Sequence, residues 1–189
     1  MSTSLLLPLL LQVAYQTSGT PVMESEKIET YDVAGTTSTE LWDQIRQFGP
    51  TDAAGKHYAG DLLSNIHWQT WLHTDAQGCS VERSEVTVDT VVTVPRWTNA
   101  REGSEALQTD WDIFLSRLKE HEAGHRSNAV KAAQAVREAI EGVGRMPDCD
   151  TLRPLVKQAA EAAIDHWKQV DIDYDTTTRH GETQGAVLH

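Results

Sequence analysis

Residues 118–126, Leu-Lys-Glu-His-Glu-Ala-Gly-His-Arg, decide how the rest of this chain is arranged. They contain the pattern H-E-x-x-H, in which two histidines bind a metal ion and the glutamate acts as a base in zinc hydrolases. On an α-helix, residues four apart lie on one face about 6 Å from each other, so His121 and His125 can reach one ion. Glu122 is offset by about 100° from His121, so we expect it to flank the metal and hold the attacking water.

The surrounding sequence predicts a long helix whose buried stripe includes both histidines. Apolar residues recur at intervals of three and four on either side of the motif; they are Leu107, Trp111, Phe114 or Leu115, Leu118, Ala129, Ala132, Val136 and Ile140. Ser104 is a candidate N-cap, and the helix stops at Gly142, Gly144 and Pro147. A buried histidine pair needs partners, which one metal ion supplies to both. Gly124 costs about 1 kcal/mol relative to Ala within a helix, so we expect another segment to approach closely there.

The composition indicates one domain with an acidic surface. The chain has 189 residues, of which 39% are hydrophobic, enough for one sizeable core. It has 16 Lys and Arg residues against 28 Asp and Glu residues, a net charge of -12. This charge disfavours nucleic acid and anionic membrane surfaces as partners. It leaves the substrate and the oligomeric state open.

Residues 1–26 are interpreted as a signal peptide or a disordered N-terminal segment, and residues 27–189 as the folded domain. Residues 5–13 form an apolar run that is too short to span a bilayer and resembles the apolar core of a signal peptide. The first charged residue is Glu24, although no Lys or Arg precedes the run and no clear cleavage site follows it. We therefore expect a secreted or periplasmic protein, with a cytoplasmic location as the alternative.

The two cysteines, Cys79 and Cys149, are too few and too far apart for a zinc ribbon or a C-x-x-C redox motif. In an oxidising compartment we expect them to form one disulfide between the strand region and the loop after the long helix. Closing such a long loop contributes roughly 2–4 kcal/mol. In a reducing compartment they are two unrelated buried thiols.

The remaining elements predict an α+β, zincin-like fold: a small, twisted, mostly antiparallel sheet packed on the long active-site helix, plus a second C-terminal helix. Alternating or β-branched runs indicate strands at 27–33, 66–73, 79–83 and 86–94, the last closed by Pro95. A short helix is expected at 38–48, ended by Gly49-Pro50. The second long helix is expected to begin at Asp150 or Thr151 and to continue through Val170.

A zinc site on His121 and His125 still needs a third protein ligand. The residues after His125 lack the metzincin continuation H-x-x-G-x-x-H, and Glu161 is the one candidate for a glutamate on a following helix. The polar stretch 171–186 is rich in side chains that bind or position ligands, and His180 lies beside a glycine within it. His180 is the best remaining ligand, and Asp175 is a candidate either for a hydrogen-bond partner of a ligand histidine or for the third ligand itself.

Four stretches resemble a bacterial family of uncharacterised domains whose members are described as predicted secreted zinc-dependent proteases. They are Tyr31-Asp32-Val33-x-Gly35, Pro95-Arg96-Trp97, the H-E-x-x-H motif, and a C-terminal motif from Tyr174 to Ala186 (Y-D-x-x-T-x-H-G-x-x-Q-G-A). The resemblance runs from about Tyr31 to Ala186. It implies a zincin-like metallopeptidase fold and export, and it supplies no substrate.

The function expected from these observations is zinc-dependent hydrolysis of a peptide or protein substrate. One Zn²⁺ per chain, held by His121, His125 and His180, lowers the pKa of its bound water to about 7. Glu122 is the general base, and Tyr174 is the candidate for stabilising the oxyanion, with His166 as the alternative. Two alternatives remain: an exported zinc-bearing binding module without catalytic activity, and an amidase that acts on cell-wall peptides.

Overall fold

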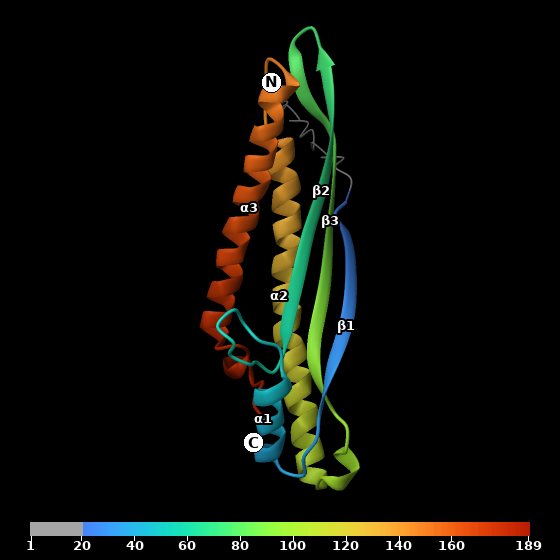
Figure 1. Ribbon diagram of the computed structural model, residues 1–189, viewed down its shortest axis with the longest axis vertical. Helices are drawn as coiled ribbons and strands as arrows, with labels where there is room; N and C mark the ends of the chain where they lie inside the picture. The colour runs from blue at the N-terminus through green and yellow to red at the C-terminus, as the bar shows by residue number, and fades with distance from the viewer. Residues whose placement is uncertain (1–20) are drawn as a thin grey trace, which may run out of the picture.

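The computed structural model describes residues 21–189, and its two longest helices lie side by side along a narrow sheet (Figure 1). The elements in chain order are β1 (Met23–Val33), α1 (Ser38–Phe48), β2 (Asp61–Asp75), β3 (Gly78–Trp97), α2 (Glu105–Glu141) and α3 (Cys149–Thr178). Two short 3-10 turns, Ala100–Glu102 and Glu182–Gln184, precede α2 and follow α3. α2 packs against both the sheet and α3. The predicted α+β class is therefore confirmed.

The long helix predicted around the H-E-x-x-H motif is confirmed as α2. The Ser104 hydroxyl accepts a hydrogen bond from the Leu107 backbone N–H at 3.2 Å, which satisfies one of the free donors at the helix start. His121, Glu122 and His125 are 3%, 2% and 7% exposed. The buried stripe of α2 therefore includes the motif, as its periodicity predicts.

The sheet is mixed, which corrects the prediction of a mostly antiparallel one. The strand order is β1-β3-β2, with β1 parallel to β3 and β2 antiparallel to it. β2 and β3 are joined by a tight hairpin and must be antiparallel. β1 pairs with the other edge of β3, and α1 and β2 lie between these two strands along the chain. This longer connection allows parallel pairing.

β3 is one continuous strand, although the sequence predicts two shorter ones ending at Pro95. Its pairing with β2 stops at Thr93, while its pairing with β1 continues to Trp97. Pro95 lacks a backbone N–H, and it lies in the part of β3 that has only one neighbouring strand. The missing donor therefore does not end the strand.

The apolar core is divided into two clusters, and the histidine pair lies between them on α2. One cluster gathers around the β3 end and the start of α2 and consists of Val33, Leu41, Ile45, Val92, Val94, Trp97, Leu107, Trp111, Phe114, Leu118, Ala186 and Leu188. The other joins the far half of α2 to α3 and consists of Cys79, Val86, Val88, Ala129, Ala133, Val136, Ile140, Leu152, Val156 and Ala160. The motif thus lies in a polar region between the two apolar clusters.

α3 is longer than the sequence predicts. Asp148 caps its start by accepting a hydrogen bond from the Thr151 N–H at 2.7 Å, and the helix ends at Thr178 rather than near Val170. The stretch 171–178 has few apolar residues, so its periodicity does not predict a helix. In the structure it is helical, and Asp171 and Asp175 on one of its faces pair with His125 of α2.

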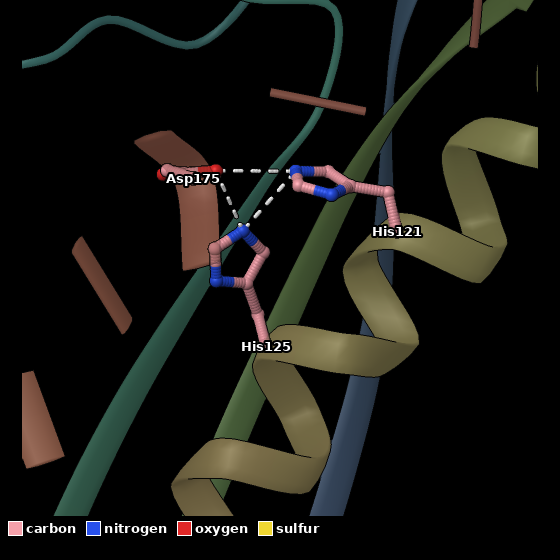
Figure 2. A group of neighbouring side chains, drawn as sticks. All are labelled: His121, His125 and Asp175. Atoms are coloured by element: carbon pink, nitrogen blue, oxygen red, sulfur yellow. Dashed lines mark hydrogen bonds and ion pairs between the residues drawn. The ribbon is translucent and has the colours of Figure 1, made fainter. Parts of the chain in front are cut away.

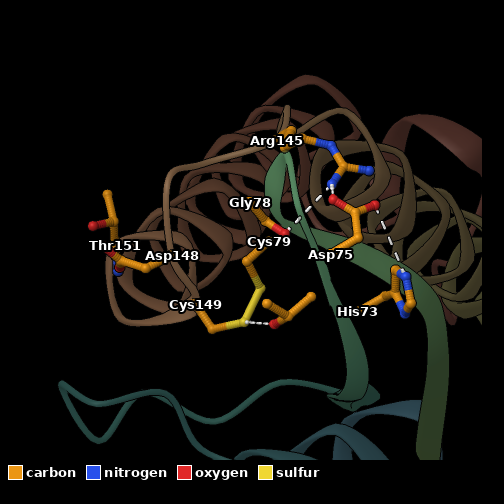
Figure 3. Close-up of a disulfide and its surroundings, with 9 residues drawn as sticks. His73, Asp75, Gly78, Cys79, Arg145, Asp148, Cys149 and Thr151 are labelled. Carbon is orange, nitrogen blue, oxygen red and sulfur yellow. Dashed lines mark hydrogen bonds and ion pairs between the residues drawn. A yellow bond between two sulfur atoms is a disulfide. The ribbon is translucent and has the colours of Figure 1, made fainter.

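The predicted disulfide between Cys79 and Cys149 is present and joins the start of β3 to the start of α3 (Figure 3). The Cα atoms of the two cysteines are 5.1 Å apart. A short backbone bridge between Cys79 and Met146 and an ion pair between Arg145 and Asp75 support the same corner. The second helix is therefore held to the β hairpin at the end of the molecule away from the histidines.

The predicted signal-peptide core, residues 5–13, lies outside the described residues. The first strand begins at Met23, four residues before the predicted domain boundary at residue 27. Between residues 21 and 189 no helix is long and apolar enough to cross a membrane.

Candidate metal centre

Three side-chain atoms from two helices point to one place between α2 and α3 (Figure 2). The Nε2 atoms of His121 and His125 are 3.2 Å apart. The Asp175 Oδ1 atom lies 3.2 Å from the first and 3.1 Å from the second. The three potential ligand atoms therefore form a nearly equilateral triangle.

The donor set and its spacing fit a zinc ion. In a tetrahedral zinc site, ligand atoms about 2.0–2.1 Å from the metal are about 3.3 Å from each other. The triangle of His121, His125 and Asp175 has sides of 3.1–3.2 Å. Two imidazole nitrogens and one carboxylate oxygen also form one of the usual ligand combinations of catalytic zinc, which leaves the fourth position open.

Each histidine is oriented through its other ring nitrogen. His121 Nδ1 donates to Gln184 Oε1 at 2.9 Å, and His125 Nδ1 donates to Asp171 Oδ1 at 2.8 Å. Asp171 is held in turn by Asn128 Nδ2 at 3.0 Å. In the neutral form of each histidine the Nδ1 atom carries the proton, and the Nε2 lone pair is directed at the shared centre.

Tyr174 fixes the distance between the two helices at this level. Its ring stacks on His121 at 5.2 Å between centroids, and its hydroxyl donates to the His121 carbonyl oxygen at 3.2 Å. A Cβ atom on Gly124 would lie 2.1 Å from the Tyr174 hydroxyl oxygen. The expected close approach of another segment at Gly124 is therefore confirmed, and α3 supplies that segment.

Glu122 is the buried carboxylate beside the triangle. Its Oε2 atom is buried and has no hydrogen-bond partner among the described residues. Burial raises the pKa of Glu122 to about 7, although the nearby His125 and His121 act in the opposite direction. A carboxylate with this pKa is suited to accept and return a proton near neutral pH.

A cavity of about 180 Å³ opens over these groups. Its walls come from the loop before β2, the start of β2, α2 and the end of α3. The titratable side chains that line it are Asp52, Tyr58, Asp61, His121, Glu122, His125, Asp171, Asp175 and His180. The loop comes close to the base, because a Cβ on Gly60 would lie 2.5 Å from Glu122 Oε1. Glu122 and the triangle therefore face one enclosed space.

In the metal-free site, imidazole and carboxylate groups face each other and change each other's pKa. Burial works against protonation of His125, but hydrogen bonds to Asp171 and Asp175 raise its pKa to about 10. Burial also works against ionisation of Asp175, yet its hydrogen bonds to His121 and His125 hold its pKa well below the usual range. In the metal-free protein His125 therefore favours its protonated form, and binding of a metal at Nε2 would require loss of that proton.

The structure does not place His180 in the triangle, although the sequence favours it as the third ligand. His180 Nδ1 is 3.3 Å from Asp175 Oδ1, and the ring lines the cavity with 42% of its side chain exposed. The third donor is Asp175, which stands one helical turn after Asp171. Glu161 is exposed and pairs with Lys157 at 3.5 Å, so it is excluded as the ligand.

Tyr174 also differs from its expected role. It is absent from the cavity wall, and its hydroxyl is used by the His121 carbonyl and by Gln184 Nε2, which donates to it at 3.1 Å. Because its ring stacks on His121 and does not line the cavity, its hydroxyl is not placed to stabilise an oxyanion there. The structure gives it a positioning role instead.

The other segments of the resemblance have structural tasks around the site. Asp32 and Arg96 face each other across β1 and β3 and form a bidentate ion pair at 2.6 and 2.9 Å. Trp97 Nε1 donates to the Gly35 carbonyl oxygen at 3.0 Å. After α3, the left-handed residues His180 and Gly181 turn the chain back so that Gln184 reaches His121.

The sequence does not assign a role to Asp171, Gln184 or Gly60, all three of which act at the site. A signal for Asp171 and Asp175 exists in their spacing of four, which matches the spacing of His121 and His125 and is typical of two helices facing each other. Gln184 belongs to the C-terminal motif of the resemblance, which gives it no role, and Gly60 has no comparable signal because it approaches the motif through a loop.

The comparisons with known proteins give one result. A family model described as "Bacterial protein of unknown function (DUF922)" matches residues 28–181. No protein with a curated description and no solved structure matches the chain.

Proposed function

The chain belongs to the DUF922 family of bacterial proteins of unknown function, and we propose that it is a zinc-dependent hydrolase that cleaves peptide bonds. The observation that carries the proposal is the combination of two features in one cavity. One is the triangle of His121, His125 and Asp175, and the other is the buried carboxylate of Glu122 with its unpartnered Oε2 atom. A metal site with a purely structural task needs the first feature and not the second.

The chain's own residues divide the work as follows. His121, His125 and Asp175 would hold the zinc, which supplies a water of lowered pKa and polarises the scissile carbonyl. Glu122 would take a proton from the attacking water and pass it to the leaving amine, as its pKa of about 7 allows. Leu118 and the Gly60 backbone confine the carboxylate and limit its contact with bulk water.

His180 takes the role that Tyr174 is not placed to fill. Its ring lines the cavity next to Asp175 and stacks near Tyr58, with 4.4 Å between ring centroids. From this position a ring N–H can donate to the carbonyl oxygen of a substrate as negative charge develops there. We assign it to that task rather than to metal binding.

An extended peptide is the substrate that suits the surroundings of the cavity. β2 is an edge strand of the sheet, and its first residues, Asp61 and Leu62, line the cavity. An extended chain can pair with such an edge through its backbone, as peptides do in other strand-addition complexes. Its scissile bond would then lie beside Glu122.

The Glu122→Gln variant tests the proposal. It keeps the shape of the side chain and removes the base, so we expect zinc content close to that of the wild type and at least a 100-fold loss of peptide cleavage. Cleavage is measured by mass spectrometry on a mixture of unstructured peptides, with cell-wall peptide fragments as a second substrate set.

The matched control is Glu120→Gln, which removes an exposed carboxylate two residues away that pairs with Arg117. This variant should keep full activity. Wild-type protein that holds zinc and cleaves nothing would favour the non-catalytic binding module. Cleavage confined to the cell-wall fragments would favour the amidase.

A further inference from the structure

A second cavity of about 240 Å³ adjoins the metal centre and has a different chemistry. It lies between α2, α3 and the edge strand β2. Its apolar wall consists of Ile66, Ala129, Ala132, Ile164 and Trp167. The small side chains of the two alanines on α2 leave the space open.

The two cavities share a wall of two residues. His125 and Asp171 line both, and they are joined by the 2.8 Å hydrogen bond from His125 Nδ1 to Asp171 Oδ1. A group seated in the second cavity is therefore next to a proposed zinc ligand.

The second cavity is large enough for an aromatic ring. Cavities of about 150 Å³ with apolar walls bind benzene. The polar residues at the second cavity include Asn128, which already donates to Asp171, and Lys168, which is largely exposed and pairs with Asp165. Besides Ser64 and Asn65 of β2, the groups that remain for an occupant are the apolar side chains of the wall.

We infer that this cavity binds a bulky apolar side chain of the substrate, of the size of leucine or phenylalanine, next to the bond that is cleaved. The inference rests on the proposed function for the position of the cleaved bond. β2 supports it, because residues 61–62 line the first cavity and residues 64–66 line the second. A peptide that follows this strand would pass the metal and then the apolar wall.

Two hydroxamates that anchor on zinc test the side-chain preference without turnover: N-acetyl-phenylalanine hydroxamate and N-acetyl-glycine hydroxamate. Calorimetry on the zinc-loaded protein should show the phenylalanine compound binding about 10- to 100-fold more tightly, because its ring is buried in the cavity. In Ala132→Leu the added side chain fills the cavity, and the two affinities should differ by less than threefold.

The control is Ala135→Leu, a half-buried position on the same helix that does not line the cavity; it should keep the wild-type ratio. If Ala132→Leu does not fold, Trp167→Ala removes the largest wall residue and should lower the ratio at least fivefold. An unchanged ratio in a folded Ala132→Leu or Trp167→Ala variant, or equal affinities in the wild type, would overturn the inference.

Peptide cleavage by the wild type separates this inference from the proposed function. Cleavage without any preference for bulky apolar residues refutes the subsite and leaves the hydrolase. A large affinity ratio without cleavage of any peptide refutes the hydrolase and leaves the apolar site beside the metal. A protein that binds no zinc refutes both.

Discussion

The Tyr174 hydroxyl occupies the space that a side chain at residue 124 would need: a Cβ on Gly124 would lie 2.1 Å from its oxygen. α2 therefore has a glycine in its middle because α3 rests on it there. The same hydroxyl donates to the His121 carbonyl oxygen, one turn before His125. The pair Gly124 and Tyr174 thus determines how closely the two helices approach each other and where His121 lies.

Gly124→Ala should destabilise the protein, although alanine is the better helix former by about 1 kcal/mol. The methyl group would push α3 away and separate Asp175 from the two histidines, so zinc affinity should also fall at least tenfold. Thermal unfolding and zinc titration measure the two effects. In a Tyr174→Ala background the same change should become stabilising, because the clash is gone. Gly124→Ala that stabilises the wild type would contradict the close contact.

Asp175 and His180 are distinguished by zinc affinity. Asp175→Ala removes one corner of the triangle and should weaken zinc binding more than 100-fold, whereas His180→Ala should change it less than threefold. His180→Ala should instead lower turnover at least tenfold, because it removes a donor from the cavity wall. Competition with a zinc-sensitive dye measures the affinities. A loss in His180→Ala as large as that in Asp175→Ala would return the ligand role to His180.

Gln184→Ala tests whether the C-terminal turn orients His121. Its amide oxygen accepts the His121 Nδ1–H at 2.9 Å, and loss of such a partner lowers metal affinity by about 10- to 100-fold. Thr183→Ala, a change in the same turn that leaves His121 untouched, is the control and should keep wild-type affinity. Equal affinities in Gln184→Ala and the wild type would show that the stacked Tyr174 ring is sufficient.

Glu122 should make the stability of the metal-free protein depend on pH. Its pKa is raised by burial to about 7 in the folded state, from 4.5 when unfolded. Between these values the folded state binds more protons, so the free energy of unfolding falls as the pH rises from 4.5 to 7. The difference between these two pKa values corresponds to about 3 kcal/mol.

Urea unfolding of wild type and Glu122→Gln in the presence of a chelator isolates this contribution. The difference between them should change by about 3 kcal/mol from pH 4.5 to pH 8, with the wild type losing stability relative to the variant. A difference that stays constant over this range would mean that Glu122 is solvated and has an ordinary pKa.

The sequence predicts α2 and its buried stripe well, because a helix of 37 residues repeats the same periodic signal many times. It fails at residues 171–178, where polar side chains suggest a loop. Asp171, Tyr174 and Asp175 are half-buried on the side that faces α2, and no local pattern reveals that Asp171 and Tyr174 have partners about 50 residues away. Asp175 could be named as a candidate but not chosen over His180, because the choice depends on how α3 and the following turn pack.

The parallel pairing of β1 with β3 escapes the sequence for a related reason. Alternation identifies a strand and its buried face but carries no information about its neighbour. The pairing of Asp32 with Arg96 is consistent with the observed register, yet the two residues are 64 positions apart. Such a pair can be identified only when the register is known.

The metal content of the purified protein tests the central claim most directly. Elemental analysis after exposure to zinc and removal of the excess should give about one zinc per chain in the wild type and less than about 0.1 in His125→Ala, with both proteins folded by circular dichroism. A stable wild-type protein that retains no zinc, or that retains iron in its place, would contradict a zinc centre at His121, His125 and Asp175.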